Sequence, residues 1–97
     1  MTASIPSVTL SSRITVSDDV LMQEVGDEVV LLDLASERYF GLDPVGTRIW
    51  ELLPERQDLA DILTSLCEEF DAEPARIEHD LLTLVLSLSE AGLVKVE

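Results

Sequence analysis

Two strands and the start of a helix are encoded in residues 28–44, which read EVVLLDLASERYFGLDP. Side chains of a strand point alternately to its two faces, so Val30, Leu32 and Leu34 form one fully apolar face of residues 28–34. The valine and leucine that alternate with them make the other face partly apolar. This pattern is expected of a central strand that is covered on both sides.

The neighbouring segments predict an antiparallel meander around this strand. Residues 35–37 predict a turn, and residues 38–42 predict a short strand at the edge of the sheet. Upstream, residues 20–25 predict the remaining strand and residues 26–27 a tight turn. Consecutive strands with such short connections pair in sequence order.

The hydrophobic period then changes from two to about 3.6, which predicts helices. Three are expected, over residues 44–53, 58–70 and 74–91, and each starts with a capping residue or a proline. Gly92 is placed to end the last helix, and residues 93–96 predict a short terminal strand. Three antiparallel strands followed by three helices predict an α+β domain that is winged helix-turn-helix-like.

One domain with an amino-terminal arm is predicted. Residues 1–13 are rich in serine and threonine and lack a helical period, which favours a flexible arm, while residues 14–97 form the domain. No secretory signal is visible, and no apolar stretch approaches the roughly 20 residues of a membrane helix. A single cysteine, Cys67, suits a reducing compartment, so we expect a cytoplasmic protein.

The charge of the chain limits its partners. Six lysines and arginines against twenty aspartates and glutamates give a formal net charge of −14. Nucleic acids and anionic membranes are bound through clustered cations, so neither is an expected partner. The favoured partners are neutral, basic or mainly apolar. The alternative is that the charge only keeps a small domain soluble.

Side chains for catalysis or metal binding are scarce. His79 and Cys67 are the sole histidine and cysteine, and zinc sites need about four clustered ligands. Gly41 and Gly46 are isolated and do not form a phosphate-binding loop. An acid/base pair among the many carboxylates stays open from sequence, but the chain is predicted to be no enzyme and to use no cofactor.

The third predicted helix has more apolar surface than one core contact requires. At about 100° per residue, its core stripe consists of Ile77, Leu81, Leu84, Leu88 and Ala91. Leu82 and Leu86 point about 120° or more away from that stripe. Either the rest of the domain or a dimer covers them, or part of the helix lines a groove for a partner.

The predicted edge strand, residues 38–42, provides a second wall for such a groove. An edge strand exposes unpaired backbone groups, which folded proteins usually protect. An extended peptide can pair with such an edge as an added strand, while its alternate side chains enter pockets. The alternative is an ordinary edge that binds nothing, so the groove depends on the edge and the apolar helix together.

The pattern of strands, turns and helix starts resembles a known family. Residues 29–34 read VVLLDL, residues 38–53 read RYFGLDPVGTRIWELL, and the capped helix at 58–70 and the closing Gly92-Leu93 follow. The resemblance covers about residues 14–96 and is to the PqqD-like family. These are the RiPP recognition elements, which serve ribosomally made, post-translationally modified peptides.

The resemblance implies that a precursor's leader peptide pairs antiparallel with the third meander strand and lies against the third helix. The implied strand contacts are Arg38, Tyr39, Phe40 and Gly41. The implied helix contacts are Asp80, Leu81, Thr83, Leu84 and Ser87, with Leu82 and Leu86 as further candidates. On this basis Asp80 would hold a basic or hydroxyl group, and the leucines would receive an aromatic or proline anchor. The alternatives are a solvated Asp80 and leucines that belong only to the core.

Within the family, residues 39–44 (YFGLDP) resemble the stand-alone B1 proteins of lasso peptide pathways. That resemblance implies three partners: the precursor leader, a cysteine leader protease and an ATP-dependent macrocyclase. One alternative is a peptide chaperone of the pyrroloquinoline quinone type, serving a radical SAM enzyme. Another is a winged-helix dimerisation or regulatory domain. A monomer or a weak dimer is expected.

Overall fold

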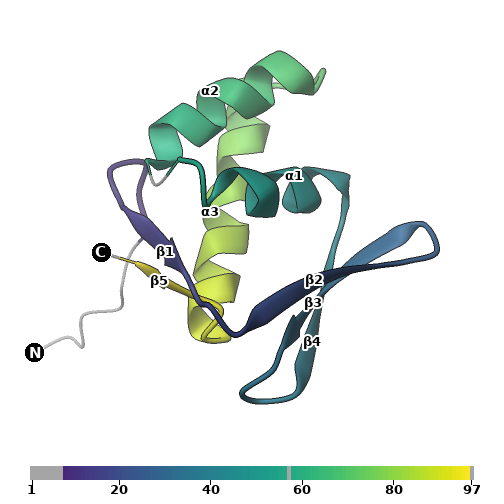
Figure 1. Ribbon diagram of the computed structural model, residues 1–97. Helices are drawn as coiled ribbons and strands as arrows, with labels where there is room; N and C mark the ends of the chain where they lie inside the picture. Colours follow the sequence, from purple (N-terminus) through teal and green to yellow (C-terminus); the bar gives the residue numbers. More distant parts are fainter. Residues whose placement is uncertain (1–7, 57, 97) are drawn as a thin grey trace, which may run out of the picture.

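The computed structural model describes residues 8–56 and 58–96, and a three-stranded antiparallel sheet leads into the helices (Figure 1). The sheet consists of β2 (Val20–Val25), β3 (Glu28–Asp33) and β4 (Arg38–Leu42), in the order β2-β3-β4. This order confirms the predicted meander, and it leaves both β2 and β4 as edge strands.

Three helices follow the sheet, as predicted. They are α1 (Pro44–Leu52), α2 (Leu59–Glu69) and α3 (Pro74–Glu90). The carboxylates of Asp43 and Asp58 each accept a backbone N–H of the first turn, at 2.6 and 3.0 Å, and so fix where α1 and α2 begin. The α+β class is confirmed, while the winged-helix description fits only loosely. None of the helices in the described part of the chain has the length and apolar character needed to cross a membrane.

The carboxyl-terminal strand, β5 (Val94–Val96), forms a separate ribbon. It pairs antiparallel with β1 (Ile14–Val16), a strand that the sequence patterns did not predict. Gly92, with φ of +82°, ends the turn between α3 and this ribbon. The ribbon is a sheet of its own, so neither end of the described chain closes the meander.

Part of the predicted amino-terminal arm is packed against the domain. Of residues 1–13, the first seven lie outside the described residues. Val8 and Leu10 pack against the core, and Ser12 is buried, with its hydroxyl accepting a backbone N–H three residues upstream at 3.0 Å. Val8, Leu10 and Ser12 of the predicted arm therefore contact the domain, while the flexibility of the arm stays a prediction.

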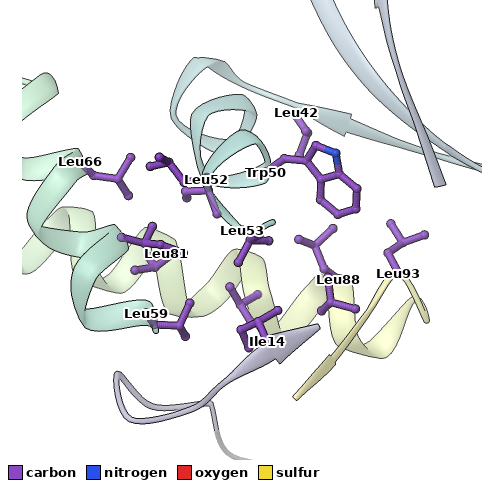
Figure 2. Packing of buried hydrophobic residues seen from close by; sticks show 14 of the residues in the cluster. Ile14, Leu42, Trp50, Leu52, Leu53, Leu59, Leu66, Leu81, Leu88 and Leu93 are labelled. Carbon is purple, nitrogen blue, oxygen red and sulfur yellow. The ribbon is translucent and has the colours of Figure 1, made fainter. Parts of the chain in front are cut away.

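The helices and the inner face of the sheet share one hydrophobic core. Figure 2 shows Leu42 of β4, Trp50 and Leu52 of α1, and Leu81 and Leu88 of α3 in this cluster. Aliphatic side chains fill most of it. Among the described residues, Trp50 is the only buried aromatic residue. The core holds β4 and α3 to the same body, and this arrangement positions the candidate site.

Only one face of β3 is covered, which corrects the prediction of cover on both sides. Leu31 is 0% exposed and Asp33 is buried, so this face points to the core. Val30 and Leu32 on the other face are half-buried, and Leu34, which follows the end of β3, is 51% exposed. The more apolar face therefore points outward, because the opposite face is the one that joins the core shared with the helices.

Candidate peptide-binding slot

One long border of β4 is open. Its strand partner is β3, and no other strand in the described part of the chain pairs with it. Two hollows lie beside β4: α3 lines the larger one, and Ala91 and Leu93, which follow α3, line the smaller one. The hollows and the β4 edge between them are called the slot below.

The larger hollow, of about 370 Å³, lies where β4 ends and α1 begins. Gly41 lines it from β4, and Asp80, Thr83, Leu84 and Ser87 line it from α3. These five residues were all predicted as peptide contacts. The structure brings them together because α3 crosses the carboxyl end of β4.

The smaller hollow, of about 200 Å³, lies where β4 starts. Arg38, Tyr39 and Phe40 line it together with Ala91 and Leu93, which follow α3. The start of β4 thus lies near the end of α3, and the end of β4 lies near the middle of α3. A peptide antiparallel to β4 would consequently run along the slot in the same direction as α3.

The other three predicted helix residues lie elsewhere. Leu81 is fully buried in the core, so the alternative of a purely core role applies to its side chain. Leu82 is half-buried against the core, and Leu86 is half-buried; neither lines either hollow. At about 100° per residue, Leu82 and Leu86 face the flank of α3 away from Leu84, which explains why they do not reach the slot.

The first turn of α1 forms the floor of the larger hollow, and sequence reasoning missed this contribution. Gly46 lines the hollow, and a Cβ atom there would lie 3.1 Å from Asp43 Oδ1 and 3.4 Å from a methyl carbon of Leu84. A side chain at this position would therefore push against both walls. The sequence signal that could have revealed this contribution is the Asp43-Pro44 helix start, which places the first turn of α1 directly after β4.

The slot has charged groups of both signs at its larger hollow. Asp43, Arg76 and Asp80 line it, and the Asp43 carboxylate is already engaged as the cap of α1. Asp80 is exposed and has no side-chain hydrogen bond or ion pair within residues 8–56 and 58–96, so its carboxylate faces the hollow and solvent. The arrangement suits an extended peptide with an apolar anchor and a basic or hydroxyl group.

The turn before β4 is held by Asp33. Its carboxylate accepts the Ala35 backbone N–H at 3.1 Å and the Ser36 hydroxyl at 2.8 Å. Glu37 completes the turn with φ of +60°, and its N–H donates to the Asp33 carbonyl at 2.7 Å. These bonds fix the position of Arg38, where the open edge starts.

Groups suited to metal binding are not clustered in the described residues. No set of three or more histidine, cysteine, aspartate or glutamate side chains there is placed to hold a metal ion. Cys67 is half-buried against the core, and His79 is exposed on α3. The slot combines the backbone of β4 with apolar, hydroxyl and charged side chains.

A family model described as coenzyme PQQ synthesis protein D (PqqD) matches residues 28–94. The chain belongs to the PqqD family. Its curated relatives include a PqqA binding protein of Xanthomonas campestris pv. campestris (strain B100), 34% identical over 70 residues, covering 72% of this chain and 74% of the relative. A PqqA binding protein of Rhizobium meliloti (strain 1021) is 31% identical over 98 residues, covering 99% and 98%.

Two solved structures share the fold of this PqqD-family chain. TbiB1 in complex with the TbiA(beta) leader peptide is 39% identical, with a TM-score of 0.72, and covers 82% of this chain and 93% of that one. A lasso peptide synthetase B1 complexed with the leader peptide is 27% identical, also with a TM-score of 0.72, and covers 86% and 98%. Both similar proteins were solved with a leader peptide bound.

Proposed function

We propose that this PqqD-family chain captures the leader segment of a ribosomally synthesised precursor peptide as a strand added to β4. The observation that carries the proposal is the open border of β4 with two hollows beside it, one lined by α3 and the other by residues that follow α3. Backbone hydrogen bonds along the edge would supply affinity, and the hollows would select side chains. The similar structures with leader peptides support this choice of ligand.

The residues of the proposed contact come from both walls. On β4 they are the backbone of Arg38, Tyr39, Phe40 and Gly41, and on α3 they are Asp80, Thr83, Leu84 and Ser87. Leu81 supports the slot from within the core instead of touching the peptide. The role is capture and presentation without catalysis by this chain.

The captured leader would be delivered to the enzymes that process the precursor. In a lasso pathway these are the leader protease and the macrocyclase, and the likeness to the B1 structures favours this pathway. A second candidate is a peptide chaperone in pyrroloquinoline quinone synthesis, which the relatives named PqqA binding protein favour. Titration with a lasso-type leader and with a PqqA peptide distinguishes the two by which one binds.

Amide hydrogen exchange with the leader of the precursor encoded beside this chain's gene tests the capture site. Binding with a dissociation constant on the order of 1 nM to 1 μM is expected. Alternate amides of Arg38–Leu42 should then exchange at least about tenfold more slowly, because an added strand bonds every second backbone group. Amides of Val20–Val25 serve as the internal control and should keep their rates.

Two results would contradict the proposal. If no leader from a neighbouring precursor binds, the capture function is wrong. If a leader binds but protects β2 and leaves β4 unchanged, the chain captures peptides at a different edge.

A further inference from the structure

An apolar stripe runs across the outward face of the three-stranded sheet, where Gln23 and Glu28 are the polar residues of the strands. This outer stripe consists of Leu21, Val25, Val30, Leu32, Leu34 and Tyr39. Leu21, Leu32 and Tyr39 are directly opposite one another in the register, so they share a face, and the others follow by alternation. The exposed fractions of Leu21, Val25, Leu34 and Tyr39 are 46%, 60%, 51% and 71%.

The packing of residues 8–56 and 58–96 does not account for the outer stripe. The opposite face of the same sheet supplies Leu31 and Leu42 to the core, and the helices lie on that side (Figure 1). An antiparallel sheet with one solvated face usually presents polar side chains there. Contiguous exposed apolar side chains are typical of interaction surfaces.

Acidic residues flank the outer stripe at both ends. Asp27 and Glu28 lie at the β2–β3 turn, and Asp19 and Glu37 lie at the opposite end of the sheet. Arg38 is the one cation within the three strands, and its pairing with Asp33 places it on the inner face. Two copies of a chain with net charge −14 would bring like-charged rims together, which disfavours self-association.

We infer that the outer stripe docks a second protein, whose contact surface has an apolar centre and a rim of lysine and arginine side chains. The inference rests on the proposed function in one respect. A leader added to β4 extends the sheet, so its alternate side chains lie beside Tyr39 on the same outward face. The partner therefore contacts sheet and peptide as one continuous surface and prefers the loaded chain, as suits an enzyme that processes the peptide.

The apolar part of this surface is tested with neighbouring residues of β2. The probes are the proteins encoded by the genes flanking this chain's gene, each purified and titrated singly against the full chain, with and without leader. Leu21→Glu places a charge in the contact and should weaken binding of one probe about 10- to 100-fold. Met22→Glu is the matched control, because Met22 is similarly exposed, at 40%, but lies on the other face; its effect should stay below about threefold.

The charged rim is tested with a second matched pair. Glu28→Lys and Glu24→Lys change the net charge equally, and both residues are exposed, but they lie on opposite faces of the hairpin. Glu28→Lys should slow association with the probe severalfold more than Glu24→Lys does, and added salt should reduce that difference. Equal effects of the two substitutions would overturn the basic-rim assignment.

Leader titration of the same variants separates the two proposals. Leu21→Glu should bind leader as the unmodified chain does and should keep its melting temperature, because Leu21 is outside the slot and partly exposed. Two outcomes would overturn the docking surface alone. In the first, the chain binds leader but none of the flanking proteins. In the second, Leu21→Glu and Met22→Glu bind the flanking proteins equally well. If sedimentation velocity shows a dimer that Leu21→Glu dissociates, the stripe contacts a second copy of the chain, and the proposal of a different protein partner is also wrong.

Discussion

The sheet has two open borders that differ in what lies beside them. β2 and β4 are both edge strands of the order β2-β3-β4, so each presents unpaired backbone groups. β4 shares two hollows with α3 and the residues that follow it, whereas no residue of β2 lines either hollow. In Figure 1 the β2–β3 hairpin extends away from the helices.

The difference shows what makes an edge selective. Backbone hydrogen bonds are available at any sheet edge and carry little information about sequence. Side-chain pockets supply the selectivity, and beside β4 these are the two hollows lined by α3 and the residues that follow it. We therefore expect variants of the α3 wall to change leader affinity, and variants around β2 to change only stability or partner docking.

The largest effect is expected from a charge in the wall of the slot. Leu84→Glu should weaken leader binding at least about 100-fold, because the carboxylate would lose solvent when the peptide covers the hollow. Leu86→Glu is the control on the opposite flank of the same helix and should change affinity less than about threefold. Calorimetric titration with the leader measures both.

Leu84 also packs partly against the core, so a second wall variant separates binding from folding. Ser87→Phe fills the larger hollow from a position that is not part of the core cluster. It should weaken leader binding by about tenfold or more while the melting temperature stays near that of the unmodified chain. Equal affinities of Ser87→Phe and the unmodified chain would exclude the larger hollow as the contact.

A smaller effect on the slot is expected from Gly46→Ala. The added methyl would press on Asp43 Oδ1 and on Leu84, which costs about 1–3 kcal/mol, while the better helix propensity of alanine returns up to about 1 kcal/mol. We expect a net loss of about 1 kcal/mol in the free energy of unfolding and a severalfold weaker leader affinity. Gly41→Ala is the control for stability alone, since open space surrounds that position in the free protein. Urea unfolding checks both variants, and leader titration checks Gly46→Ala.

Local patterns predicted the elements well, because each one has its own signal. The run of valine and leucine after Glu28 and the Asp43-Pro44 helix start each predicted an element without reference to the rest of the chain. Strand β1 was missed because Ile14–Val16 is only three residues long and its partner lies at the other end of the chain. Such a pairing leaves little local signal to detect.

The slot was harder to predict than the fold, because it depends on how far each side of α3 is covered. Helical spacing showed that Leu82 and Leu86 leave the core stripe, but spacing alone does not say which flank of a helix faces β4. The apolar outer face of β3 misled the prediction for a related reason. Apolar character suggested burial for Leu34, whereas the helices cover only the face of Leu31.

A change at the β2–β3 turn should reduce stability and leave the slot unchanged. Gly26 has φ of +65° and no neighbour within 4 Å of a Cβ position, so Gly26→Ala acts through the backbone alone. A cost of about 1–2 kcal/mol is expected, with a melting temperature lower by several degrees. Gly26→Asn should recover part of the loss, because asparagine tolerates this conformation. Leader affinity below the transition should stay within about twofold, and a larger change would show that the β2 hairpin contributes to capture.

The smallest effect is expected at the ion pair between α1 and α2, which lies outside the slot. Arg48 Nε donates to Glu69 Oε1 at 2.7 Å, and this hydrogen bond lowers the pKa of Glu69. A lowered folded-state pKa means that ionised Glu69 stabilises the protein at neutral pH, and that this contribution disappears as the pH falls through the lowered pKa. Glu69→Gln should therefore reduce the melting temperature slightly at pH 7, since exposed pairs contribute little, and the two melting curves should converge in acid. Leader affinity at neutral pH should be the same for both proteins, because selectivity depends on the wall beside β4 and not on how α1 and α2 are tied together.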